Sequence, residues 1–175
     1  TIHIIDFGLS ASYRAEDGSH VPCRSRAAAG EVSGTARYAS LAAHCGTQSR
    51  RDDLEALGYM LTYFVNGTLP WQGIRGADKN RVIWQKKVST PLEEVCHGEA
   101  APLLPYLEYC RSLDFEQEPD YALLRQLLRA QWQGLGIVND GWMDWHLRKE
   151  DARPERPPAA APRRTNTLTL PSAKL

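Results

Sequence analysis

Residues 49–67 carry the strongest structural signal in the chain, Ser-Arg-Arg-Asp-Asp-Leu-Glu-Ala-Leu-Gly-Tyr-Met-Leu-Thr-Tyr-Phe-Val-Asn-Gly. Past its first turn it is apolar almost all round, which is typical of a helix buried in a core. Ser49 suits the N-cap, and Asp52 and Asp53 stand in the first turn, where the helix dipole favours anions. The closing Asn-Gly pair is a helix stop signal. The pattern therefore predicts a central buried helix over residues 50–65.

The apolar spacing of the residues that follow predicts further helices. The glycine inside the first helix, Gly58, costs about 1 kcal/mol relative to Ala, so we expect close helix packing there. The next helix is expected to bury Val82, Ile83 and Val88. Pro91 suits the first turn of the helix after it. The predicted helices span residues 77–90, 92–96, 103–112 and 121–132.

The two ends of the chain differ from this helical middle. Ile2–Ile5 reads as a short buried strand, and residues 10–34, poor in large apolar side chains, read as a long exposed loop. Residues 151–175 are rich in Pro, Ala, Arg and Thr, a composition that predicts a disordered tail. We therefore expect one folded domain over residues 1–150 followed by the tail. The chain starts without Met inside a strand-like run, so we expect it to be a piece of a longer protein.

Composition and charge exclude several classes of protein. Of 175 residues, 42% are hydrophobic and 24% charged, which is ordinary for a globular domain. Lys+Arg and Asp+Glu are 21 each, so the basic excess of a generic nucleic-acid or anionic-membrane binder is missing. No apolar run approaches the ~18 residues of a membrane span. The four cysteines form no C-x-x-C pair, which favours thiols in a reducing compartment, cytoplasm or nucleus, over a zinc site.

Several short motifs follow one another along the chain. The first motif, Asp6-Phe7-Gly8, taken alone, reads as a strand that ends in an Asp-x-Gly turn. A carboxylate held at that point by a flexible glycine could also present a metal ion to a ligand. The series consists of Asp6-Phe7-Gly8, Gly34-Thr35-Ala36-Arg37-Tyr38-Ala39-Ser40, the helix stretch quoted above, Leu69-Pro70-Trp71-Gln72-Gly73 and Arg111-Ser112-Leu113-Asp114-Phe115.

This ordered series resembles the C-terminal lobe of a eukaryotic protein kinase. In detail it is similar to the casein kinase I family of serine/threonine kinases, whose members carry a G-T-A-R-Y-A-S segment and an S-R-R-D-D-L-E-x-L-G-Y helix. The resemblance covers roughly residues 1–147. It implies a mainly α fold, the large lobe of the kinase fold, with a short β element at its start.

The resemblance also implies roles for individual residues. It implies ATP- and Mg²⁺-dependent transfer of the γ-phosphate to Ser or Thr of protein substrates, with Asp6 as metal ligand and contact to the cofactor. Thr35 would bond the catalytic machinery, and Asp53 would accept N–H bonds from the catalytic loop as a buried carboxylate. The alternatives are a surface hydroxyl for Thr35 and a simple first-turn, dipole-favoured carboxylate for Asp53.

Two basic residues match an anion site of the family. Arg37 and Lys79 correspond to cations that select acidic or already phosphorylated substrates. A planar guanidinium suits this role because it meets phosphate oxygens bidentately. The alternative for Lys79 is a cation on a solvated helix face.

Other family motifs are not found in these residues. There is no Gly-rich loop, no strand lysine with its helix glutamate and no H-R-D-x-x-x-x-N loop. We therefore expect the parent protein to be a monomeric kinase and this chain alone to be inactive. Two alternatives stay open, namely a non-catalytic, pseudokinase-like interaction module and an unrelated helical binding domain. A structure in which the helix over residues 49–65 is exposed instead of central would favour the latter.

Overall fold

The computed structural model describes residue 3 and residues 5–23, 32 and 34–134. The chain divides into two compact units, Thr1–Gln131 and Trp132–Leu175, and the described residues up to Gln131 belong to the first. The domain boundary expected at residue 150 and the expected tail over residues 151–175 lie outside the described residues.

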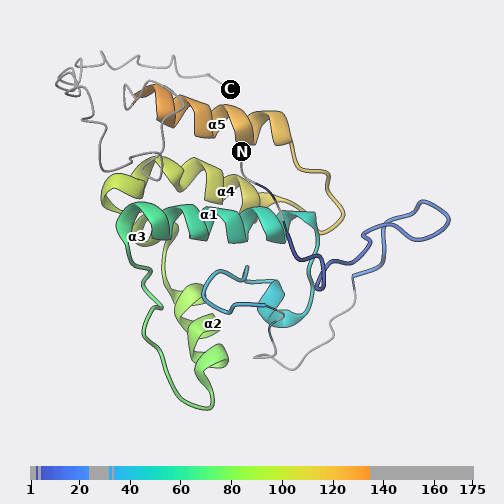
Figure 1. Ribbon diagram of the computed structural model, residues 1–175, viewed down its shortest axis with the longest axis horizontal. Helices are drawn as coiled ribbons and strands as arrows, with labels where there is room; N and C mark the ends of the chain where they lie inside the picture. The colour runs from blue at the N-terminus through green and yellow to red at the C-terminus, as the bar shows by residue number, and fades with distance from the viewer. Residues whose placement is uncertain (1–2, 4, 24–31, 33, 135–175) are drawn as a thin grey trace, which may run out of the picture. The chain divides into compact units, whose positions relative to one another are not determined.

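The described part of the chain is mainly helical, as the sequence predicts (Figure 1). Each predicted helix is present, with ends that differ from the prediction by at most two residues. None of the helices in the described ranges is long and apolar enough to cross a membrane. The elements, in chain order, are η1 (Ala43–Cys45), α1 (Arg50–Asn66), α2 (Lys79–Ser89), α3 (Leu92–Val95), η2 (Gly98–Leu103), α4 (Leu104–Ser112) and α5 (Tyr121–Gly134).

The ends of α1 follow from the residues that flank it. Ser49 is the N-cap with an extended backbone, and its N–H donates to the Asp52 carboxylate over 2.7 Å. At the other end Gly67 adopts the left-handed conformation (φ 72°), and its N–H donates to the Tyr63 carbonyl over 2.8 Å. A left-handed residue is a common C-terminal stop, and glycine adopts it without steric cost. Both predicted helix signals are confirmed.

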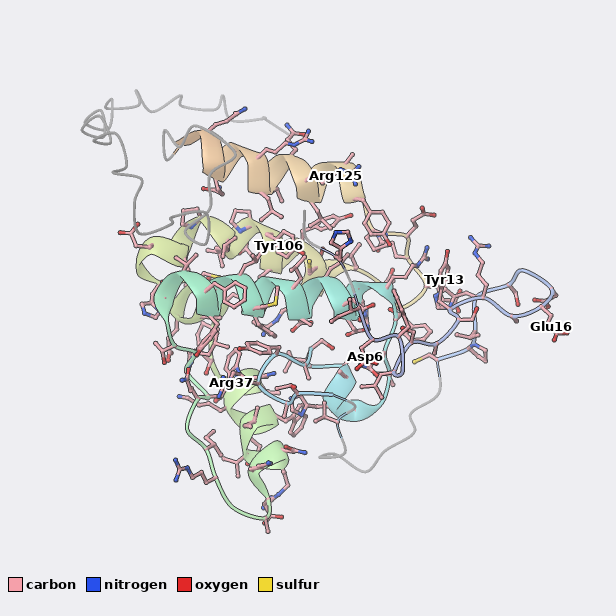
Figure 2. The ribbon with its side chains drawn as sticks, in the orientation of Figure 1. Asp6, Tyr13, Glu16, Arg37, Tyr106 and Arg125 are labelled. Carbon is pink, nitrogen blue, oxygen red and sulfur yellow. The ribbon has the colours of Figure 1, made fainter. Side chains whose placement is uncertain are left out.

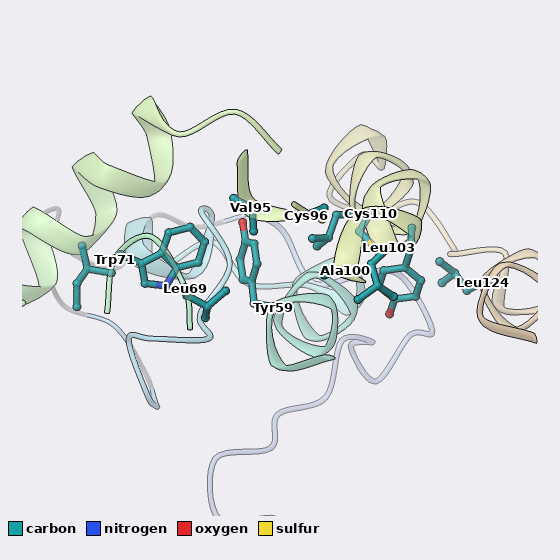
Figure 3. Close-up of a cluster of buried hydrophobic side chains, with 12 residues drawn as sticks. Tyr59, Leu69, Trp71, Val95, Cys96, Ala100, Leu103, Cys110 and Leu124 are labelled. Carbon is teal, nitrogen blue, oxygen red and sulfur yellow. The ribbon is translucent and has the colours of Figure 1, made fainter. Parts of the chain in front are cut away.

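Helix α1 is also central, as predicted. It packs against α4 and η2, and residues of these helices lie in the buried cluster shown in Figure 3, together with residues of α2, α3, α5 and the turn that holds Leu69 and Trp71. Within that cluster the ring of Tyr59 meets the ring of Trp71 edge to face at a centroid distance of 5.0 Å. The Tyr106 hydroxyl donates to the Leu54 carbonyl over 3.1 Å and so ties α4 to α1.

The crossing of α1 and α4 explains the helical glycine. A Cβ atom on Gly58 would lie 2.5 Å from Cδ2 and 2.9 Å from Cγ of Leu107. Leu107 is fully buried, so its side chain has little room to move. The close packing expected at Gly58 is confirmed.

The buried face of α2 differs from the prediction. Val82 and Val88 are 39% and 58% exposed, and the buried residues are Ile83 and Lys87. Apolar spacing alone missed this face because a fully buried lysine completes it. The ammonium group of Lys87 has hydrogen-bond acceptors in the core, which makes its burial tolerable.

The N-terminal segment also differs from the prediction. His3 and Ile5, the described residues of the expected strand, are not in a strand, and Ile5 is 80% exposed. The described residues offer no neighbouring strand to pair with it, only an isolated bridge between Arg14 and His20. A strand needs such partners to be stable. The loop after this segment is largely exposed over residues 10–23, as predicted.

We predict that Gly58→Ala destabilises the chain. The added methyl group overpacks the contact with Leu107, which costs about 1–3 kcal/mol, and this outweighs the ~1 kcal/mol that Ala gains in helix propensity. Urea unfolding followed by circular dichroism measures the change. Ala56→Gly on the same helix is the control for propensity alone.

Shortening the Leu107 side chain tests whether its contact with the added methyl group causes the loss of stability. In a double-mutant cycle with Leu107→Ala, Gly58→Ala should cost less than it does against Leu107, because the space it needs is then present. An equal cost in both backgrounds would show that Gly58 is not there for helix packing.

Candidate functional site

The segment Thr35–Ser40, which we call the Arg37 segment, carries two of the candidate site residues. It has no regular secondary structure, and its internal backbone bonds run from the N–H groups of Tyr38 and Ala39 to the Thr35 carbonyl, at 3.0 and 3.2 Å. Such a segment leaves carbonyl groups that must find other partners where they are buried.

Two side chains from outside the segment hold three of these carbonyls. Lys87 Nζ donates to the carbonyls of Ala36 and Ala39 over 2.9 and 2.5 Å. Trp71 Nε1 donates to the Arg37 carbonyl over 2.7 Å. The backbone on both sides of the Arg37 side chain is therefore fixed to the core.

The end of the segment is fixed to the first turn of α1. Ser40 Oγ donates to Asp52 Oδ1 over 2.5 Å and accepts the Ala43 N–H over 2.9 Å. The other Asp52 oxygen accepts the Ser49 N–H. Asp52 is thus a buried carboxylate with bonded oxygens, which links the segment to the helix start.

Arg37 lies half-buried against two aromatic rings. Its Cζ atom is 5.8 Å from the ring centroid of Tyr38 and 5.4 Å from that of Tyr63, and these rings meet edge to face. In the parts of the chain that the structure describes, no carboxylate forms an ion pair with this guanidinium. Its position is labelled in Figure 2. Stacking orients the planar group, and its donors can receive an anion.

Lys79, the second expected anion ligand, is the first residue of α2 and is exposed. No side-chain hydrogen bond or ion pair joins it to another residue in the described ranges. Lys79 lies at the positive end of the helix dipole, where a cation is unfavourable by itself and a bound anion would be favourable. The structure shows no contact between Lys79 and Arg37.

Asp6 lies on the surface, on the N-terminal segment (Figure 2). Its backbone is left-handed (φ 63°), and its Oδ1 accepts the Gly8 N–H over 3.1 Å. A non-glycine residue in this conformation is uncommon, although Asp tolerates it better than most. The described residues hold no group of three or more His, Cys, Asp or Glu that could bind a metal ion. This part of the chain therefore offers Asp6 as a single oxygen ligand.

Thr35 and Asp53 are both exposed. Asp53 is not the buried carboxylate that was expected, because the buried aspartate of this pair is Asp52. Its expected N–H partners belong to a catalytic loop that these 175 residues do not contain, so that role stays a prediction. Partial loss of hydration, and then the neighbouring charge of Asp52, raise the pKa of Asp53. Thr35 contributes its carbonyl to the turn of the Arg37 segment.

Sequence reasoning missed the residues that fix this segment. Lys87 stands four positions after the buried Ile83, the spacing of one helix face, which was the available signal. Trp71 and Ser40 stand in the quoted motifs, but no local pattern marked them as partners that fix this segment, because each reaches its partner across more than ten residues of sequence.

A histidine lies next to this framework. His44 is fully buried, and burial, followed by the positive charge of Lys87, lowers the pKa of its ring to about 4. Its ring is therefore neutral at pH 7 in the folded chain.

A comparison with known protein families finds no family model that matches this chain.

We predict that His44 makes the fold acid-sensitive. The unfolded chain takes up a proton near pH 6.5, whereas the folded chain takes it up only near pH 4, so stability falls as pH falls through this window. At ~1.4 kcal/mol per pKa unit, about 2 kcal/mol is lost between pH 7 and pH 5. Urea unfolding at the two pH values measures it.

The matched variant is His44→Leu, which removes the titrating group and keeps a buried side chain. Its stability should change about 2 kcal/mol less between the two pH values than that of the unaltered chain. Parallel pH profiles for the two proteins would remove His44 as the cause.

Proposed function

We propose that this chain is the C-terminal lobe of a casein kinase I-like serine/threonine protein kinase. The enzyme would transfer the γ-phosphate of ATP, with Mg²⁺, to Ser or Thr of acidic or phospho-primed protein substrates in the cytoplasm or nucleus. The observation that carries the proposal is Arg37. Its guanidinium is stacked on two rings, has no acidic partner in the described residues and sits on a fixed backbone.

The position of α1 supports this proposal over an unrelated helical binding domain. An exposed helix would favour the alternative, whereas Tyr59 and Gly58 are buried in the core. The ordered motifs 6–8, 34–40, 49–61 and 69–73 support the family resemblance independently.

The chemistry divides between this chain and the rest of the proposed enzyme. Asp6 supplies a hard oxygen of the type Mg²⁺ prefers, but Mg²⁺ needs phosphates, waters and further ligands around it. These 175 residues hold no Gly-rich loop and no H-R-D catalytic loop. Phosphoryl transfer would therefore need a longer chain, and we expect this one alone to be inactive.

A second candidate function is a non-catalytic interaction module. The Arg37 segment is held entirely by residues of this chain, so anion recognition needs no catalytic loop. A partner with a phosphoserine or an acidic side chain would be bound without reaction.

We predict that Arg37→Ala weakens binding of a phosphoserine peptide by about ten- to a hundredfold, because it removes a charge-assisted bond of roughly 1.5–3 kcal/mol. Calorimetric titration of this chain measures it. The unphosphorylated peptide should be nearly unaffected. Arg75→Ala, at an exposed position of the same charge, is the control. An equal loss for both peptides would assign Arg37 a structural role.

We also predict that Asp6→Asn, made in a longer chain that includes the upstream kinase motifs, lowers kcat by far more than tenfold with the fold intact. The substitution removes the charge that holds the metal and changes little volume. Steady-state kinetics and circular dichroism measure the two effects. Retention of more than about a tenth of the rate, equal to ~1.4 kcal/mol of barrier, would exclude Asp6 as a metal ligand.

A further inference from the structure

Lys87 is a lysine with no exposed surface, and with Ile83 it forms the buried face of α2. Lysine is almost never fully buried unless its ammonium group is paired. No carboxylate within the described ranges forms an ion pair with it. Its partners are instead two backbone carbonyls and the faces of two aromatic rings.

The geometry suits a cation. Nζ lies 5.1 Å from the ring centroid of Tyr59 and 4.9 Å from that of Trp71, within the range of cation–π attraction. It also donates to the carbonyls of Ala36 and Ala39. Both of these bonds are long-range in sequence, at separations of 51 and 48 residues. The bonds therefore act on the Arg37 segment and not on α2 itself.

These two carbonyls flank Arg37. A segment whose own backbone bonds both run to one carbonyl has little to hold its shape, and Ala39 is buried, so its carbonyl cannot turn to water without the segment moving. The same ring that faces Lys87, that of Trp71, also donates to the Arg37 carbonyl. One small group of side chains thus determines the backbone on both sides of the guanidinium.

We propose that Lys87 is a positioning residue whose buried ammonium group holds the Arg37 segment in the conformation that presents the Arg37 guanidinium. The local ordering is a property of this chain alone. The consequence for phosphoserine recognition rests on the proposed function.

If Lys87 served only to stabilise the whole fold, replacing it would loosen all helices and not the Arg37 segment alone. Replacing a buried charge by an apolar side chain of similar shape is often neutral or stabilising for a fold, because the desolvation cost of the charge disappears. Lys87→Met keeps most of the stem and removes the ammonium group. A positioning role predicts unchanged global stability with a loosened Arg37 segment.

Hydrogen exchange of the backbone amides tests this at pH 6, where the ammonium is charged, since burial lowers the pKa of Lys87 only to about 7. In Lys87→Met the amides of Tyr38 and Ala39 should exchange at least about tenfold faster, and those of α1 at their usual rate. Lys87→Arg, which keeps cationic donors, should restore part of the protection. Lys86→Met, at the exposed neighbouring position, should change nothing.

Unchanged exchange at Tyr38 and Ala39 in Lys87→Met would overturn the proposal. Faster exchange by the same factor in α1 and α4 would also overturn it, because it would show a loss of global stability. If Lys87→Met does not fold, the unaltered chain decides the question. Its Lys87 ammonium should give a slowly exchanging ¹H–¹⁵N signal that the exposed lysines lack, and the absence of that signal would overturn the proposal.

Binding of the phosphoserine peptide separates this proposal from the proposed function. If the unaltered chain binds it, Lys87→Met should weaken binding by about tenfold or more, and Lys86→Met should not. Equal affinity of the unaltered chain and Lys87→Met would overturn the link to Arg37. No binding by the unaltered chain would contradict the proposed function, and the exchange rates would still decide the role of Lys87.

Discussion

A backbone without regular secondary structure can be buried only if its carbonyl groups find donors elsewhere, and this constraint governs the Arg37 segment. The donors are the ammonium of Lys87 and the indole N–H of Trp71. Because those donors sit on α2 and on the turn that precedes it, both elements must lie against the Arg37 segment. The positions of Tyr59 and Trp71 in the core then follow, since their rings enclose the ammonium.

Two further charged groups, those of Glu55 and Arg111, act on the buried Lys87 from nearby. Glu55 on α1 accepts a bond from the Tyr59 hydroxyl over 2.6 Å and pairs with Arg111 of α4 at 3.4 Å. Arg111 also donates to the Tyr59 hydroxyl over 2.6 Å. Burial, with Glu55 next, raises the pKa of Tyr59 well above its usual value, so its hydroxyl keeps the proton that it donates. Removing one member of such a network costs more than the network contributes as a whole.

The sequence predicted where the helices begin and end better than which of their residues are buried. Helix α1 was predictable with both of its ends, because capping, stop signals and apolar spacing agree locally, and Gly58 marked its closest contact. The buried face of α2 was not, since apolar spacing cannot recognise Lys87 as a core residue. The exposed N-terminal segment and the exposed Asp53 differ from expectation because both depend on what packs against them, which no local pattern specifies.

Arg37 differs from several other cations of the chain in what its donor groups contact. Arg50 and Arg51 at the start of α1 and Arg111 on α4 each have a carboxylate partner, and Lys87 is enclosed by carbonyls and rings. Arg37 has no acid partner among the residues described, and it combines a backbone fixed by Trp71 with a guanidinium that lies over the Tyr63 ring. A guanidinium stacked on aromatic rings loses little further entropy when it meets an anion, so its orientation favours recognition of a phosphate or carboxylate.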